Sequence, residues 1–195
     1  MTLAEAAATG DVAAVERLLG EGAPVDARDR ARRTPLLVAT RENHTEAARL
    51  LIEAGADVNA KDNIRDTPFL YAGAEGRNEI LKLILATGRA NLADTNRYGG
   101  TALIPAAHHG HPETVRILLG TTIDIDHVNN LGWTALLEAV ILGDGGPVHQ
   151  AIVGLLVDAG ARDIPDGEGM TALERARARG YSEMAARIAE GPRSP

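Results

Sequence analysis

The chain has no cysteine and few aromatic residues, and these absences narrow the chemistry open to it. In 195 residues without cysteine there is no disulfide, no thiolate nucleophile and no thiolate zinc ligand. Only 3% of the residues are aromatic, although 45% are hydrophobic, which favours thin core layers of alanine and leucine. The two serines, Ser182 and Ser194, fall at an expected helix start and in the C-terminal tail, where neither has a neighbouring base to activate it.

The chain also lacks a net positive charge and long apolar runs. The formal net charge is −7, whereas binding to nucleic acid without sequence preference needs a basic face that neutralises phosphates. No apolar stretch is long enough to span a membrane. The N-terminal sequence MTLAEAAATGD lacks the basic segment and apolar run of a signal peptide. We therefore expect a soluble, cytoplasmic protein that binds neither nucleic acid nor membrane.

What the chain does have is an internal repeat. The hexapeptide TPLLVA begins at Thr34, and 33 residues later TPFLYA begins at Thr67. Shorter versions, each beginning TAL, start at Thr101, Thr134 and Thr171. Self-similarity at a fixed period of this size is typical of a solenoid built from stacked units.

Each repeat has the pattern of two short helices followed by an extended arm. In the clearest copy, Thr34 is a good N-cap and Pro35 suits the first helical position, where no N–H is required. A second helix is expected near Thr45, and Gly55 suits the left-handed residue that follows a helix. No copy has enough apolar surface to close its own core, so neighbouring copies must stack.

These residues resemble the ankyrin repeat, whose pattern of T-P-L-H-x-A, G-H, a V-x-L-L helix and G-A-D-V-N-A is nearly complete in residues 34–66. The resemblance is to small bacterial proteins made only of such repeats. It implies an all-α solenoid of about six helix-turn-helix repeats with short hairpin-like arms, in a single domain over residues 1–195. The repeats are expected at approximately 1–33, 34–66, 67–100, 101–133, 134–170 and 171–195.

Three segments depart from the pattern. The linker between the two helices of the fifth repeat is lengthened at 143–150, and its glycines and proline predict a loop. This insertion is either a tolerated surface feature or a functional one. The basic run 28–33, in which Arg32 replaces a turn glycine, is either a solvated loop or a contact surface for acidic groups. Residues 191–195 are expected to form a frayed tail.

The histidines are the best candidates for a metal site, but their placement favours structural roles. His108, His109 and His111 fall within HHGHP, and imidazole nitrogens bind several transition metals. However, neighbours on a helix point about 100° apart, and His111 stands at the Gly-His position that usually bonds backbone in the family. We therefore predict no metal, no cofactor and no catalytic residue.

The resemblance implies that partners bind the concave face formed by the arm tips and the first helices. Trp133, the only tryptophan, falls at a variable tip position, and Tyr98 lies at the tip one repeat earlier. Trp, Tyr and Arg often dominate the energy of protein contacts. The predicted partner-binding residues are Arg30, Arg33, Arg41, Asp66, Glu75, Arg97, Tyr98, His108, His109, Asn130, Leu131, Trp133, Leu142 and Met170.

The sequence therefore predicts a monomeric, non-enzymatic module that binds another protein, whose identity the sequence does not give. Two alternatives remain open at this point. One is a small-ligand or metal-binding protein, or an enzyme, with a pocket near 143–150 and His108 and His109. The other is a structural oligomer that associates through Trp133, a residue that could equally stabilise the stack of repeats.

Overall fold

The computed structural model describes residues 1–192, and all regular secondary structure in that range is α-helical. The helices follow one another in pairs, and the described range holds twelve of them. The first three pairs are α1 (Leu3–Thr9) and α2 (Val12–Gly20), α3 (Pro35–Arg41) and α4 (Thr45–Glu53), and α5 (Pro68–Ala74) and α6 (Asn78–Ala86). The last three pairs are α7 (Leu103–His108) and α8 (Pro112–Leu119), α9 (Ala135–Ile141) and α10 (Pro147–Asp158), and α11 (Ala172–Ala178) and α12 (Ser182–Glu190). Of the expected tail, residues 193–195 lie outside the described range.

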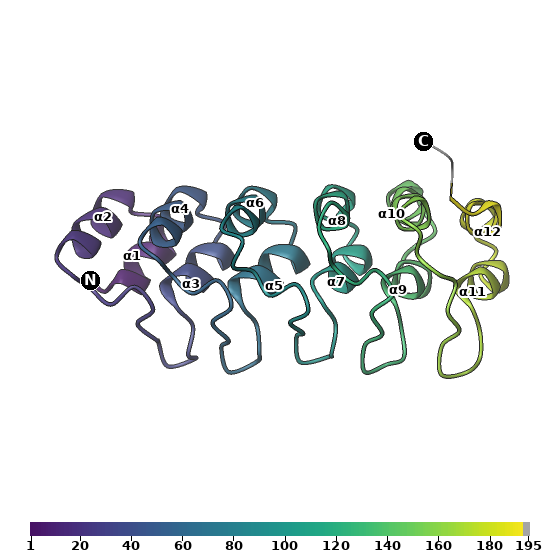
Figure 1. Ribbon diagram of the computed structural model, residues 1–195, viewed down its shortest axis with the longest axis horizontal. Helices are drawn as coiled ribbons and strands as arrows, with labels where there is room; N and C mark the ends of the chain where they lie inside the picture. Colours follow the sequence, from purple (N-terminus) through teal and green to yellow (C-terminus); the bar gives the residue numbers. More distant parts are fainter. Residues whose placement is uncertain (193–195) are drawn as a thin grey trace. The chain divides into compact units, whose positions relative to one another are not determined.

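The chain divides into two compact units. The first unit comprises residues 1–72 and 77–91, and the second comprises residues 73–76 and 92–195. Within each unit the first helices of the pairs form one layer and the second helices form another (Figure 1). The connecting loops extend from the side of the first helices, so their tips lie farthest from the second helices (Figure 1).

The first helix of most pairs begins at a threonine, as the sequence predicts. Thr34 Oγ1 accepts a hydrogen bond from the Leu37 N–H at 3.2 Å, and Thr134 does the same for Leu137 at 3.2 Å. Such caps satisfy one of the N–H groups that a helix start leaves without an intrahelical partner. At Thr171 the cap is completed by a reciprocal contact from Glu174, which forms a capping box.

The fourth repeat begins differently, because Pro105 has no N–H to donate to the Thr101 carbonyl. The Ile104 N–H donates to that carbonyl instead, at 3.3 Å, and α7 begins only at Leu103. The Thr101 hydroxyl is buried and has no hydrogen-bond partner in the described part of the chain. The threonine cap expected here is therefore absent, and one buried polar group is left unsatisfied.

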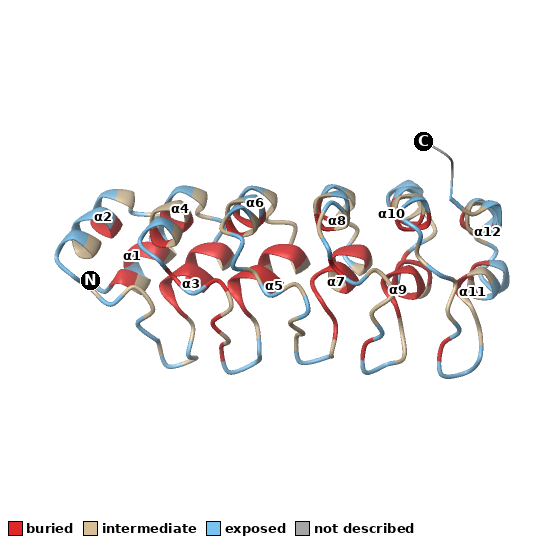
Figure 2. Cartoon of the chain, in the orientation of Figure 1, coloured by how far each residue is buried: buried red, intermediate tan, exposed pale blue. Residues whose placement is uncertain are grey.

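The core lies between the layers of each unit. The inner first helices are buried on most sides, and in α9 every residue from Ala135 to Val140 is buried (Figure 2). The terminal ones bury less, since only Ala172 and Ala176 of α11 are buried. The second helices bury one stripe only, such as Ile80, Leu81 and Ile84 of α6, all fully buried. Their opposite faces are polar and exposed, as expected for an amphipathic helix at the surface.

The segment 143–150 differs from the loop predicted for it. Only residues 142–146 connect the two helices, because Pro147 occupies the first turn of α10. Proline suits this place since its fixed φ fits a helix and its missing N–H costs no bond. Part of the inserted sequence therefore lengthens α10 to 12 residues, compared with nine in α4 and α6.

Candidate functional site

The loop tips share one backbone geometry in both units. They are the five-residue segments 29–33, 62–66, 96–100, 129–133 and 166–170. Each begins with Asp or Asn, whose Oδ1 accepts hydrogen bonds from the N–H groups two and four residues later. In the segment 96–100, for example, Asn96 Oδ1 accepts from Tyr98 at 2.9 Å and from Gly100 at 3.1 Å. The tips are therefore fixed in shape by side chains that point inward, which leaves the second and third positions free to point outward.

Neighbouring tips within a unit are also joined by backbone hydrogen bonds. In the first unit the Asn63 N–H donates to the Ala31 carbonyl at 3.0 Å. In the second unit the Asn130 N–H donates to the Tyr98 carbonyl at 3.0 Å, at the equivalent positions. Each of these two joined pairs of tips therefore presents its outer side chains at a fixed spacing, as a preformed binding surface requires.

Three of the five tips carry an exposed apolar side chain at the third position. Tyr98 is 55% exposed and Leu131 is 56% exposed, and both lie in the second unit. Ile64, at the same position in the first unit, is 41% exposed. The predicted residue set omitted Ile64, although its alignment with Tyr98 and Leu131 in the repeat would have identified it.

The predicted residues of the first unit are brought together by ion pairs. The Arg33 guanidinium lies 2.8 Å from Asp29 within its own tip, and Arg41 lies 3.5 Å from Asp66 of the next tip. The Arg41 guanidinium also stacks 4.5 Å from the centroid of the Tyr71 ring. Arg30 is exposed at the second tip position. These four predicted residues thus lie on two adjacent tips and the end of α3.

The predicted residues of the second unit lie mainly on its tips. Arg97 stacks 4.7 Å from the centroid of the Tyr98 ring and donates to its hydroxyl at 2.9 Å. Trp133 and Met170 end their tips and are half-buried, so each has both packed and accessible surface. The remaining residues of this group are exposed at a tip or at the end of α9, namely Asn130, Leu131 and Leu142.

The predicted residues around the histidines mainly make contacts between elements of the chain itself. His109 Nδ1 lies 2.7 Å from the Ala74 carbonyl and 3.8 Å from Glu75. His108 is half-buried, and its carbonyl lies 3.0 Å from Nε2 of His149, which also contacts Asp144 at 3.1 Å. The His109 contacts join α7 to the end of α5, and the His149 contacts join the start of α10 and the segment 142–146 to α7.

A buried carboxyl group, Glu138, was not predicted as a site residue. Its side chain lies on α9 and is only 8% exposed. Burial raises the pKa of Glu138 to about 7, against the lowering effect of a hydrogen bond from Asn129. His108 Nδ1 is 3.7 Å away, but burial, together with His109 and His149, lowers the pKa of His108. Near pH 7 Glu138 is therefore about half ionised while His108 is largely neutral, so we regard this contact as a weak polar one rather than an ion pair.

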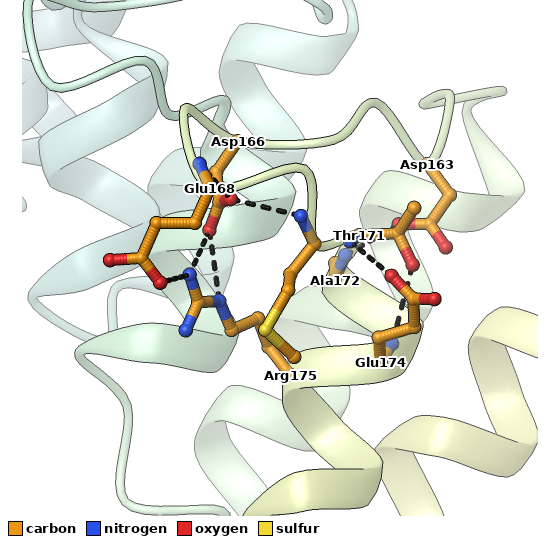
Figure 3. Close-up of polar contacts among 8 residues, drawn as sticks. Asp163, Asp166, Glu168, Thr171, Ala172, Glu174 and Arg175 are labelled. Atoms are coloured by element: carbon orange, nitrogen blue, oxygen red, sulfur yellow. Dashed lines mark hydrogen bonds and ion pairs between the residues drawn. The ribbon is translucent and has the colours of Figure 1, made fainter.

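The last tip is held by an arginine from α11. Arg175 binds Asp166, at the first tip position, with its nearest nitrogen at 2.6 Å, and it also reaches Glu168 at 2.7 Å (Figure 3). Burial raises the pKa of Asp166, but the hydrogen bonds from Arg175, Met170 and Glu168 together lower it below its usual range. The Asp163 carboxylate accepts from the Ala172 N–H at 2.7 Å, so it supports the start of the same helix (Figure 3).

The alternative site predicted near 143–150, His108 and His109 gains no support from the metal-binding groups or the cavity of the described residues. In residues 1–192 no group of three or more His, Asp or Glu side chains is arranged to hold a metal ion. A cavity of about 490 Å³ lies on the outer faces of α8, α10 and α12. Its lining residues include Arg116, Gly154 and Arg187, but neither His108 nor His109.

Known proteins that are similar to this chain consist of the same kind of repeat as its fold. The family model for ankyrin repeats matches in three overlapping copies, at residues 3–96, 56–129 and 75–165. The chain belongs to the ankyrin-repeat family. The predicted family and the predicted all-α repeat fold are therefore confirmed, and ankyrin repeats are in general protein–protein interaction modules that carry out no reaction.

Three relatives illustrate this similarity. A crystallised ankyrin repeat domain from Acinetobacter baumannii AYE is 54% identical, with a TM-score of 0.93 over 96% of both chains. The ankyrin repeat domain of Bcl-3, a member of the IkappaB family, is 29% identical with a TM-score of 0.87, over 100% of this chain and 87% of that one. The ankyrin repeat protein YahD of Escherichia coli is 46% identical over 99 residues. That match spans 50% of this chain and 49% of YahD, about half of the curated relative.

Within the described residues, every helix is too short or too polar to cross a membrane.

Proposed function

We propose that this chain binds a protein partner through the outward side chains of its loop tips and the adjoining ends of its first helices. The observation that carries the proposal is the pair Tyr98 and Leu131, which lie at equivalent positions of two hydrogen-bonded tips and are each more than half exposed. Large apolar side chains in such positions lose contact with water when a partner covers them, and that burial stabilises a complex.

The same face supplies the polar groups that give such an interface its specificity. Arg97 is already stacked on Tyr98, so part of its conformational freedom is lost before any partner arrives. We propose Asn130 and Met170 of the second unit as neighbouring contacts, and the predicted tip residues of the first unit, such as Arg30, as further contacts of the same partner. The half-buried Trp133 would contribute its accessible edge. Binding of this kind uses a rigid surface and needs no reactive group, cofactor or metal.

The test is capture of a partner by the full chain. The wild-type protein, tagged and immobilised, should retain a specific protein from a lysate of its own source, identified by mass spectrometry. The double variant Tyr98→Ala, Leu131→Ala should lose at least about tenfold of that capture, because the burial of a large apolar side chain contributes about 1.5 to 3 kcal/mol when it is complete.

A matched control is available on α10. Val148 is 47% exposed but lies on a second helix, away from the tips. Val148→Ala should therefore capture the partner as well as the wild type does, and all variants should keep their helical content by circular dichroism. Equal capture by the double variant and the wild type would contradict the proposal.

A further inference from the structure

The two tips of the first unit carry arginine where the tips of the second unit carry glycine. Arg32 and Arg65 occupy the fourth tip position with φ values of 61° and 68°. The residues at the same position in the second unit are Gly99, Gly132 and Gly169, with φ values of 76° to 79°. A residue with a side chain is strained in this left-handed conformation, whereas glycine is not. The first unit therefore keeps two arginines at positions where glycine would fit the backbone better.

These two arginines have two further arginines beside them. Arg28 and Arg30 are exposed in the first loop, and residues 28–33 hold four arginines against one aspartate. The two tips are fixed to each other by the bond from the Asn63 N–H to the Ala31 carbonyl. We call Arg28, Arg30, Arg32 and Arg65 the basic tip patch.

Most of this positive charge is not neutralised within the described residues. The guanidinium groups of Arg30, Arg32 and Arg65 make no hydrogen bond or ion pair there. Arg28 donates to two backbone carbonyls, those of Arg32 and Lys61, rather than to a carboxylate. In contrast, Arg49 on α4 is paired with both Glu46 and Glu53. The basic tip patch thus stands out in a chain whose net charge is −7.

We propose that the basic tip patch binds an extended acidic segment, rich in aspartate and glutamate, of the protein partner. This inference rests on the proposed function and gives the chemistry of part of the partner. Guanidinium groups pair with carboxylates in a planar, two-point geometry. Three of them on two joined tips, with Arg28 beside the first tip, suit carboxylates spaced along an extended chain.

Nucleic acid is the less suitable ligand of the two. Proteins that bind single strands add aromatic side chains on which bases stack, and residues 26–66 contain no Phe, Tyr or Trp. The patch offers charge without a stacking surface, so it suits a flexible chain of carboxylates better than a chain of bases.

The test measures binding of a labelled probe peptide of alternating glutamate and glycine to the full chain by fluorescence anisotropy. The matching peptide with glutamine in place of glutamate is the neutral control. The double variant Arg32→Gln, Arg65→Gln should bind the acidic peptide roughly tenfold more weakly, since each exposed charge pair is worth a factor of about two to five. Binding by the wild type should also weaken as ionic strength rises to about 0.15 M and beyond.

Two further variants make the result specific. Arg177→Gln removes an exposed, unpaired arginine of α11 in the second unit, and it should leave peptide binding unchanged. Arg32→Gly, Arg65→Gly should weaken binding as the glutamine variant does, yet raise Tm by a few degrees, because it relieves the backbone strain. The proposal would be overturned if Arg177→Gln weakened peptide binding as much as the double variants do. It would also be overturned if neither double variant weakened peptide binding. Tighter binding of an oligothymidylate of equal charge, lost in the same variants, would also overturn it in favour of nucleic acid.

The outcome is separable from that of the proposed function. Tyr98→Ala, Leu131→Ala leaves the basic tip patch intact and should bind the acidic peptide normally while losing capture of the partner. If capture depends on Tyr98 and Leu131 but the peptide does not distinguish the arginine variants, the inference is wrong and the proposed function stands. If the peptide depends on Arg32 and Arg65 but capture is indifferent to Tyr98 and Leu131, the proposed tip interface is wrong instead.

Discussion

Asn129 donates a hydrogen bond from its side-chain amide to Oε1 of Glu138 at 2.7 Å, and both side chains are buried. The equivalent pair in the last repeat, also nine residues apart, is Asp166 with Arg175. An aspartate at position 129 would place a negative charge against the carboxyl group of Glu138 and disfavour its ionisation further. The first residue of a tip is thus chemically matched to a residue on the helix that follows it. Amide Asn129 pairs with acid Glu138, and acid Asp166 pairs with cation Arg175.

Replacing Glu138 by glutamine should stabilise the protein at alkaline pH. The pKa of Glu138 is about 7 in the folded chain against 4.5 for an unburied glutamate. The folded state therefore binds more protons between these values, so stability is fully present below pH 4.5 and is lost as the pH rises through 7. Glu138→Gln keeps the acceptor for Asn129 but cannot ionise. We expect its free energy of unfolding at pH 8 to exceed that of the wild type by on the order of 2 kcal/mol.

The measurement is urea denaturation of both proteins at pH 5 and pH 8. Near pH 5 the difference should be several-fold smaller, because the wild-type carboxyl group is then largely protonated in the folded state. Glu16→Gln, at an exposed position of α2, is the control and should change stability little at either pH. A Glu138→Gln gain that is the same at both pH values would mean that ionisation of Glu138 is not its cause.

Replacing Arg175 by alanine should loosen the last tip and the start of α11. Asp166 would lose its only cationic neighbour among the described residues while its side chain stays 1% exposed, although the backbone N–H groups of Glu168 and Met170 would still bind it. A buried carboxylate without a cation is poorly compensated. We expect Tm to fall by several degrees, whereas Arg177→Ala, on the exposed side of the same helix, should leave it nearly unchanged.

The pH dependence gives a second check on Arg175. A depressed pKa of Asp166 stabilises the fold above pH 3.8, and this contribution is lost as the pH falls through the folded-state value. The Arg175→Ala variant should therefore differ most from the wild type at neutral pH and converge toward it in acid. Thermal scans followed by circular dichroism between pH 3 and 7 would measure this, and a constant difference would show that lost packing, not charge, is responsible.

The helix pairs were predictable because each one is marked locally. The cap at Thr34 with Pro35 after it, and the glycine at position 55, are signals within a few residues of the feature they specify. The period of 33 residues then placed the remaining copies. The repeat also located the tips, so predicted residues such as Tyr98 and Leu131 do lie on exposed positions.

Features that depend on contacts between repeats were not predictable in this way. The glycines of segment 143–150 suggested a loop, but the competing preference of Pro147 for a helix start extended α10. The only sequence feature that marks Glu138 is that it is charged where the second repeat has Val38. Its raised pKa depends on burial, which no local sequence pattern reveals. Whether the predicted residues contact a partner stays a prediction, as does the single domain.

The glycines at the fourth tip position should differ in their tolerance of a side chain. Gly99 and Gly132 both have positive φ, at 76° and 79°, so alanine is strained by about 1 kcal/mol at either place. A Cβ at position 99 would also lie 2.3 Å from Oδ1 of Asn130 and 3.1 Å from its backbone nitrogen, whereas at position 132 the nearest atom is 3.5 Å away. The side chain of Asn130 can rotate, but its backbone is held by the bond to the Tyr98 carbonyl. Gly99→Ala should therefore lower the free energy of unfolding by about 2 kcal/mol and Gly132→Ala by about 1 kcal/mol, as measured by urea denaturation. Equal losses in the two variants would show that the tips move apart readily, contrary to the fixed spacing on which the proposed interface depends.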